Sequence, residues 1–176
     1  MFRQNSARTT QLRLVARNGH NCYGKAARLP TRRLFLIDIE NFCGKGTLCP
    51  CDVREAKEEI VRELKPCDGD LIVIGTSHGM NCVVCGTEWE GPRQVWKPGH
   101  DGADIALIDA SREYKLDTFS SIVIVSGDGI FSTVASAVRA CKRRVIVVQG
   151  KGCLSNRLRL EASDVRCVQR HMKTAA

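Results

Sequence analysis

The segment from Ser121 to Cys141 constrains the fold of this chain more than any other. Residues 122–125 form an unbroken run of β-branched apolar side chains, which suits a strand buried on both faces and is too short for an ordinary helix. Gly127 and Gly129 then permit a tight turn, and apolar residues recur at helical spacing up to Cys141. The segment therefore predicts a strand, a turn and a helix, the repeating unit of a parallel α/β sheet.

Acidic residues follow two of the predicted strands. Asp128 lies in the turn after residues 122–125, and Asp38 directly follows the apolar run 34–37. Ligands bind at the carboxyl ends of the strands in open α/β sheets, so both carboxylates are expected at one edge. Like charges meeting there need a cation, and hard oxygen ligands favour Mg²⁺ or Mn²⁺. The alternative is that Asp128 only caps the following helix.

A third carboxylate comes from the segment 98–109, PGHDGADIALID. Its Pro-Gly start predicts a loop, Asp101 is a candidate N-cap, and Asp104 falls on the first turn of the predicted helix. Asp104 either joins the acidic edge or completes a capping box with Asp101. Asp109 lies about 140° away from Asp104 around the helix, so the two do not simply share one site.

Three runs of the sequence carry a family resemblance. LFLIDIENF, GADIALIDA and IVIVSGDGIF occur in this order and resemble the NYN domain family, which is related to the PIN-domain ribonucleases. The resemblance spans about residues 34–168, and the run LSNRLRL at residues 154–160 is similar to the last helical segment of small actinomycete NYN-domain proteins. It implies an α/β, three-layer Rossmann-like PIN/NYN domain with a mostly parallel sheet.

The resemblance also implies a function and a set of site residues. The expected activity is metal-dependent hydrolysis of RNA phosphodiester bonds, with Mg²⁺ or Mn²⁺ as cofactor. The implied catalytic metal ligands are Asp38, Asp104 and Asp128, and the implied supporting residues are Asn41, Asp109 and Ser126. The chain departs from the commoner family pattern at Ile130, where a second aspartate usually follows.

Ile130 leaves two alternatives open. It either marks a vacated ligand position beside the metal, or it lies one helical turn before Val134 and serves the core. An NYN module that binds RNA without efficient turnover is therefore the alternative function. A Rossmann-type nucleotide enzyme or phosphatase is disfavoured, because no glycine-rich phosphate-binding run follows a strand and residues 38–41 lack a paired-aspartate signature.

Charge is distributed unevenly along the chain. Residues 1–33 carry eight basic and no acidic side chains, residues 34–138 nine basic and 17 acidic, and residues 139–176 ten basic and two acidic. An acidic middle between basic ends suits a metal site that acts on a polyanion, and we expect single-stranded RNA as the partner. The cations expected near the acidic edge are Lys151, Arg157 and Arg159.

The domain organisation follows from the same patterns. We expect a basic, disordered arm at residues 1–33, the NYN (PIN-like) domain at 34–170 and a short tail at 171–176. Predicted strands and helices alternate, which indicates right-handed crossovers and a mostly parallel sheet. The family resemblance implies the PIN-like strand order 3-2-1-4-5, and residues 165–168 are expected to add an edge strand. The arm also resembles a transit peptide, but we expect a cytoplasmic protein and a possible homodimer. No apolar run reaches the length of a membrane span.

The remaining candidate site residues are the ten cysteines, His78 and Trp96. Without a secretion signal we expect reduced thiols, with Cys141 and Cys167 in core segments. Zinc binding is an alternative that would use Cys82 and Cys85 with partners from Cys49, Cys51, His78 and His100. His78 either contacts substrate or lies on the surface, and Trp96 either packs at the core or rim or stacks on bases.

Overall fold

The apolar runs of the sequence form the strands of one six-stranded sheet. A computed structural model describes residues 31–168. The strands are β1 (Arg33–Asp38), β2 (Leu71–Thr76), β3 (Arg93–Trp96), β4 (Ser121–Val125), β5 (Arg144–Gln149) and β6 (Asp164–Cys167). Their order is β3-β2-β1-β4-β5-β6, and every neighbouring pair is parallel. The predicted order 3-2-1-4-5 is therefore confirmed, and β6 adds the expected edge strand.

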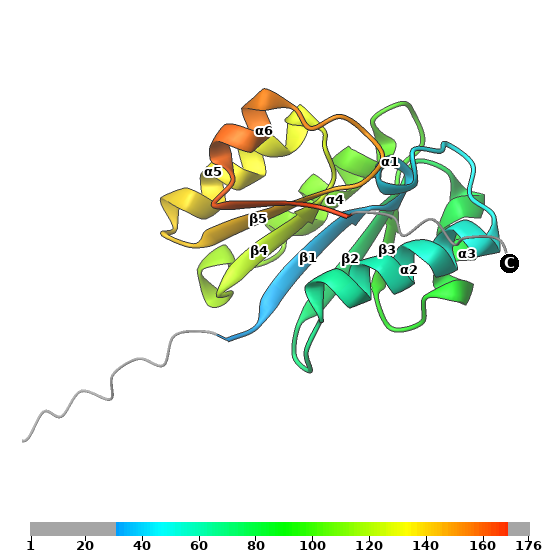
Figure 1. Cartoon of the computed structure of the whole chain (residues 1–176), viewed down its shortest axis with the longest axis horizontal. Coiled ribbons are helices and arrows are strands. Elements are labelled where there is room, and N and C mark those ends of the chain that lie inside the picture. The colour runs from blue at the N-terminus through cyan, green and yellow to red at the C-terminus, as the bar shows by residue number, and fades with distance from the viewer. Residues whose placement is uncertain (1–30, 169–176) are drawn as a thin grey trace, which may run out of the picture.

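Helices cover both faces of the sheet, which makes three layers (Figure 1). One face carries α1 (Ile39–Cys43), α2 (Pro50–Leu64) and α3 (Gly79–Glu88), and the other carries α4 (Gly102–Arg112), α5 (Ser132–Ala140) and α6 (Asn156–Glu161). Short 3₁₀ helices lie at η1 (Leu116–Thr118) and η2 (Gly129–Phe131). The predicted α/β, three-layer fold class is confirmed. Within the described residues, no helix has both the length and the apolar character needed to cross a bilayer.

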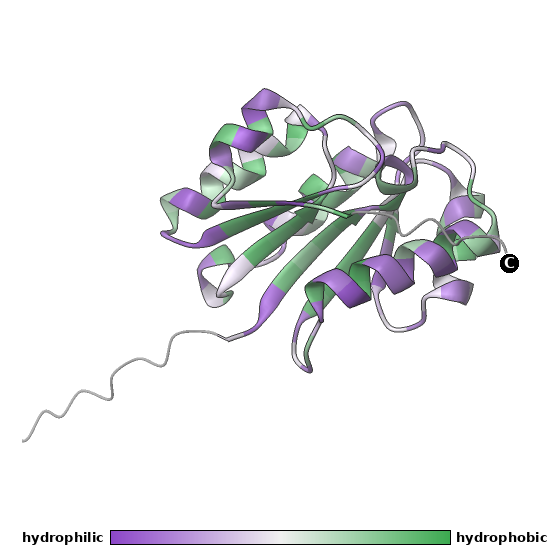
Figure 2. Ribbon diagram, in the orientation of Figure 1, coloured by the Kyte–Doolittle hydropathy of each residue, from purple (hydrophilic) through white to green (hydrophobic). Residues whose placement is uncertain are grey.

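The central strands are apolar throughout because each packs into two cores. Phe35 and Ile37 face the cluster beneath α2, whereas Leu34 and Leu36 face the cluster beneath α4 and α5. Figure 2 shows the result as a sheet coloured hydrophobic between helices whose outer faces are hydrophilic. Burial on both faces explains the continuous apolar runs that the sequence displays.

Local contacts set the element boundaries at the start of the domain. Residues 39–43 form the short helix α1, and α2 begins at Pro50, where Asp52 accepts the Cys49 N–H at 3.1 Å. Arg33, expected in the arm, begins β1 and forms an ion pair with Asp70 at 2.7 Å. Residues 1–30 of the expected arm and the tail at 171–176 lie outside the described residues.

Candidate active site

Asp38 and Asp104 meet at the carboxyl edge of the sheet. β1 ends at Asp38, which is in register with Gly75 near the end of β2. A Cβ at Gly75 would lie 2.5 Å from Leu107 Cγ and 2.9 Å from the Ala103 carbonyl oxygen, so only glycine lets α4 pack this closely. The first turn of α4, which carries Asp104, is thereby held against the end of β1.

The two carboxyl groups form a buried, coupled pair. Asp38 is 4% exposed and Asp104 is 7% exposed, and their carboxyl groups hydrogen-bond to each other. Burial raises the pKa of Asp38 to about 6. Burial, followed by the charge of Asp38, raises the pKa of Asp104 to about 8. Because each carboxylate is buried and repels the other, ionisation of both groups is disfavoured unless a cation binds between them.

Asn41 and Ser126 fix the orientation of Asp38. The Asn41 N–H donates to Asp38 Oδ1 at 3.0 Å, and Ser126 Oγ donates to Asp38 Oδ2 at 3.4 Å. Asn41 Oδ1 in turn accepts the Gly127 N–H at 3.1 Å, which ties α1 to the loop after β4. Two of the three predicted supporting residues therefore lie in contact with the acidic pair or its loop.

One oxygen of the pair is left without a partner. Asp104 Oδ1 is buried and accepts no hydrogen bond from the residues that the structure describes. A buried carboxylate oxygen of this kind is costly unless it binds a donor or a cation. Carboxylate oxygens are hard ligands, so a pair of carboxyl groups with one oxygen free of hydrogen bonds fits Mg²⁺ or Mn²⁺. The capping-box alternative for Asp101 is wrong, because no side chain caps α4.

Asp128 lies at the rim of the site. Its side chain is exposed, and Oδ1 accepts the Ile130 N–H at 2.9 Å, so it caps η2 as the alternative predicted. Its charge adds to the causes that raise the Asp104 pKa, after burial and the charge of Asp38. Within residues 31–168, Asp38, Asp104 and Asp128 do not bring one carboxylate oxygen each within 4.8 Å of one another.

Two other candidates lie away from the acidic pair. Asp109 is half-exposed and forms ion pairs with Lys97 and, at 2.7 Å, with Arg112. It therefore does not contact Asp38 or Asp104. The Ile130 side chain is partly buried and packs against the apolar cluster beneath α4 and α5, which matches the core alternative.

A polar network beside the pair was not predicted. Glu40 Oε1 accepts the Ser77 N–H at 2.9 Å and Asn81 Nδ2 at 2.6 Å, and its other oxygen accepts Ser77 Oγ at 2.5 Å. Buried Asn81 also accepts the Leu48 N–H at 3.1 Å, which anchors the loop before α2. Glu40 could have been noticed beside Asp38, whereas Asn81 carries no local sequence signal because its partner is 41 residues away.

The predicted cations and Trp96 lie on three separate segments. Lys151 follows β5, and its N–H donates to the Phe42 carbonyl at 3.1 Å. Arg157 and Arg159 lie on α6, and neither guanidinium forms a hydrogen bond or ion pair with another described residue. Trp96 ends β3 and is 51% exposed, so it lies at the rim and does not belong to the core.

His78 follows the end of β2 and caps the N-terminus of α3. Its Nδ1 accepts the Met80 N–H at 3.3 Å, and the side chain is exposed. This matches the surface alternative for His78. A capping role also leaves Nε2 open to solvent at the carboxyl edge.

The cysteines correct three expectations. Cys49 and Cys51 form a disulfide, because the turn into α2 brings their Cα atoms to 5.4 Å, whereas the other described cysteines form no disulfide. Cys141 follows the end of α5 and Cys167 lies on an edge strand, so both are exposed and neither is in the core.

The zinc alternative does not assemble in the described residues. The sulfurs of Cys49 and Cys51 lie near an Asp52 oxygen, within 4.8 Å of one another. Bonded as a disulfide, they supply no thiolate ligand. Cys82 and Cys85 of α3 belong to no group of three such ligands within residues 31–168.

Comparisons with known proteins support the fold. No protein-family model and no curated protein sequence matches this chain. The structure is similar to the crystal structure of a Vibrio parahaemolyticus protein of unknown function, with a TM-score of 0.52 and 15% sequence identity. The match covers 81% of this chain and 96% of that one. At this identity the similarity shows a shared fold and nothing about activity.

Proposed function

We propose that this protein is a metal-dependent ribonuclease whose reaction takes place at the Asp38–Asp104 pair. The observation that carries the proposal is the position of a buried carboxyl pair, with one unpartnered oxygen, where β1 meets β4. Chain connections run to opposite sides of the sheet from these two strands, and ligands of doubly wound sheets bind at such switch points.

Asp38 and Asp104 would hold Mg²⁺ or Mn²⁺, with Asp128 close by at the rim. The bound cation would supply an activated water and stabilise charge on the scissile phosphate. Asn41 and Ser126 keep Asp38 oriented through their hydrogen bonds to its two oxygens. The shared proton of the pair must leave before both carboxylates can act as ligands, so metal affinity should rise with pH.

The support for a nucleic-acid substrate is the charge around the acidic edge. Lys151 follows β5 and contacts α1 through its backbone, Arg157 lies just after the segment bonded to the Asp128 loop, and neither forms an ion pair with a described residue. Arg159 is a further exposed cation on α6, and the whole chain has a net charge of +8. Unpaired cations of this kind contact phosphates. The choice of RNA rests on the resemblance of three sequence runs to the NYN domain family.

A second candidate is an RNA-binding module without turnover. Two observations favour it: Asp128 uses one carboxylate oxygen as a helix cap, and Ile130 packs against the core where the family pattern has an acid. A site with two carboxylates would then bind a cation too weakly to support hydrolysis.

Cleavage of a labelled single-stranded RNA in Mn²⁺ tests the proposal. Asp104→Asn should lose cleavage, whereas the matched variant Asp109→Asn, on the same helix but outside the pair, should cleave like the wild type. Equal cleavage by the wild type and Asp104→Asn would refute the proposed site. RNA binding without cleavage by the wild-type protein would favour the second candidate.

A further inference from the structure

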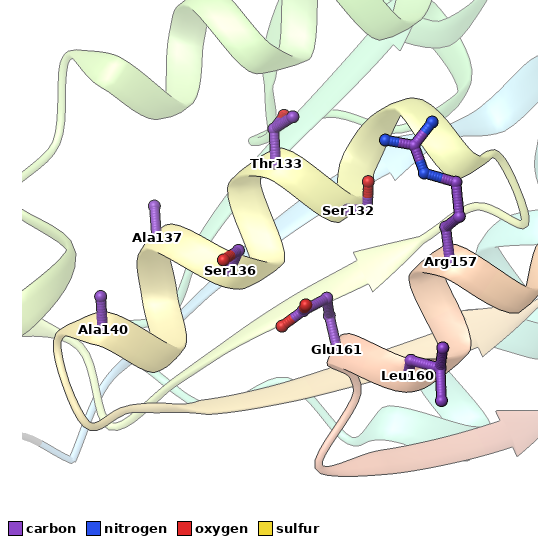
Figure 3. Close-up of a pocket in the computed structure, with 8 residues that line it drawn as sticks. All are labelled: Ser132, Thr133, Ser136, Ala137, Ala140, Arg157, Leu160 and Glu161. Carbon is purple, nitrogen blue, oxygen red and sulfur yellow. The ribbon is translucent and has the colours of Figure 1, made fainter.

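A groove between α5 and α6 opens beside the loop that carries Asp128. It encloses about 550 Å³ and is lined by Ser132, Ser136 and Ala140 from α5 and by Arg157, Leu160 and Glu161 from α6, among others. Figure 3 shows Arg157 extending from α6 toward Ser132, with Glu161 pointing across toward Ser136. The groove is thus bordered by hydroxyl groups on one helix and charges on the other.

The lining has an excess of hydrogen-bond donors. The Arg157 guanidinium and the Ser132 and Ser136 hydroxyls make no hydrogen bond to any residue in the range 31–168. Glu161 is paired with Arg139 at 3.4 Å, so its charge is partly neutralised. An anion with several acceptor oxygens would satisfy the free guanidinium and both hydroxyls.

The groove is joined directly to the candidate active site. The Ser155 N–H, just before α6, donates to the Gly127 carbonyl at 2.9 Å. Ser155 Oγ also lies so near Gly129 that a Cβ there would be 2.6 Å away. The start of α6 is therefore fixed to the loop that carries Asp128, and Arg157 follows two residues later. From this end the groove runs along α5, which is about 14 Å long.

We propose that the groove binds the sugar–phosphate backbone of single-stranded RNA on one side of the scissile bond. This inference rests on the proposed function, which places the reacting phosphate at the acidic pair. The free guanidinium and hydroxyls match phosphate oxygens, and the neighbouring Asp128 loop gives the strand a continuous path to the site. A groove between two adjacent helices accepts one backbone and leaves the bases outside, so duplex RNA should bind poorly.

Fluorescence anisotropy with a labelled single-stranded oligoribonucleotide tests the groove in EDTA, where cleavage is absent. Arg157→Ala should weaken binding about fivefold and reduce the slope of log K against log salt by about 0.7, the value for one lost phosphate contact. Arg62→Ala, an exposed arginine on α2 across the sheet, is the matched control and should change neither quantity. Ser136→Glu, which adds a negative charge to the groove, should also weaken binding.

The groove assignment and the proposed nuclease function can be refuted independently of each other. Equal effects of Arg157→Ala and Arg62→Ala, normal binding by Ser136→Glu, or equal binding of a duplex would overturn the groove assignment even if the protein cleaves RNA in Mn²⁺. The expected pattern of the three variants, together with absent cleavage, would support the groove and refute the nuclease. A full-length protein that binds no RNA overturns the inference outright.

Discussion

Replacing Asp104 with asparagine should make the metal-free protein less sensitive to high pH. In the wild type the buried pair holds a proton, because burial and mutual repulsion raise both carboxyl pKa values. The folded protein thus binds protons that the unfolded chain has released, so stability falls as pH rises from about 4 to about 8. Asparagine cannot ionise, and its amide can donate to Asp38 in place of the shared proton.

The size of the effect follows from the pKa of Asp104, the group that the variant removes. A rise from 3.8 to about 8 changes the folding free energy by about 4 kcal/mol between pH 5 and pH 8, at 1.36 kcal/mol for each pKa unit. Because Asp38 titrates together with Asp104 and stays buried in the variant, we take about 3 kcal/mol as the expected effect. For a protein of this size it corresponds to a shift of roughly 6–12 °C in melting temperature.

Urea denaturation of both proteins in EDTA, at several values between about pH 5 and pH 8, measures the difference. The unfolding free energy of Asp104→Asn minus that of the wild type should increase by about 3 kcal/mol across this range. Other titrating groups cancel in the difference. Parallel pH profiles for the two proteins would refute the coupled pair.

Three further predictions concern residues around the pair. Asp128→Asn should retain the cap and change stability by less than about 0.5 kcal/mol while weakening Mn²⁺ binding in calorimetry, and unchanged affinity would remove Asp128 from the site. Asn81→Ala should cost about 2–3 kcal/mol in urea denaturation, because Glu40 and the Leu48 N–H lose a buried partner; a cost near zero would contradict a stabilising network. RNA should quench the fluorescence of exposed Trp96, and Trp96→Ala should abolish the quenching because Trp89 is buried. Quenching that survives in Trp96→Ala would exclude this contact.

The fold was predictable because burial on both faces leaves a strong sequence pattern. The apolar runs at 34–37 and 122–125 form β1 and β4, and the alternation of strands with helices predicted the parallel sheet. Helix α1 was not predictable in this way. It has only five residues, and its cap comes from Asp38, whose side chain was assigned to the metal site.

The candidate site was only partly predictable, because a sequence locates residues at an edge without giving their separation. Asp38 and Asp104 meet because Gly75 has no Cβ and therefore lets α4 pack close to β2. The spacing of apolar residues in the sequence does not reveal this contact. Asp128 has the expected position, but local capping holds its side chain at the rim. The Glu40 and Asn81 network depends on a contact between distant segments, which local motifs cannot reveal.

Anomalous scattering from Mn²⁺ in crystals of the wild-type protein is the most direct test of the proposed metal site. We predict a peak between the carboxylates of Asp38 and Asp104, within bonding distance of Asp104 Oδ1, and no such peak in crystals of Asp104→Asn. A wild-type crystal saturated with Mn²⁺ at a pH above about 8, with no peak at this pair, would contradict the assignment.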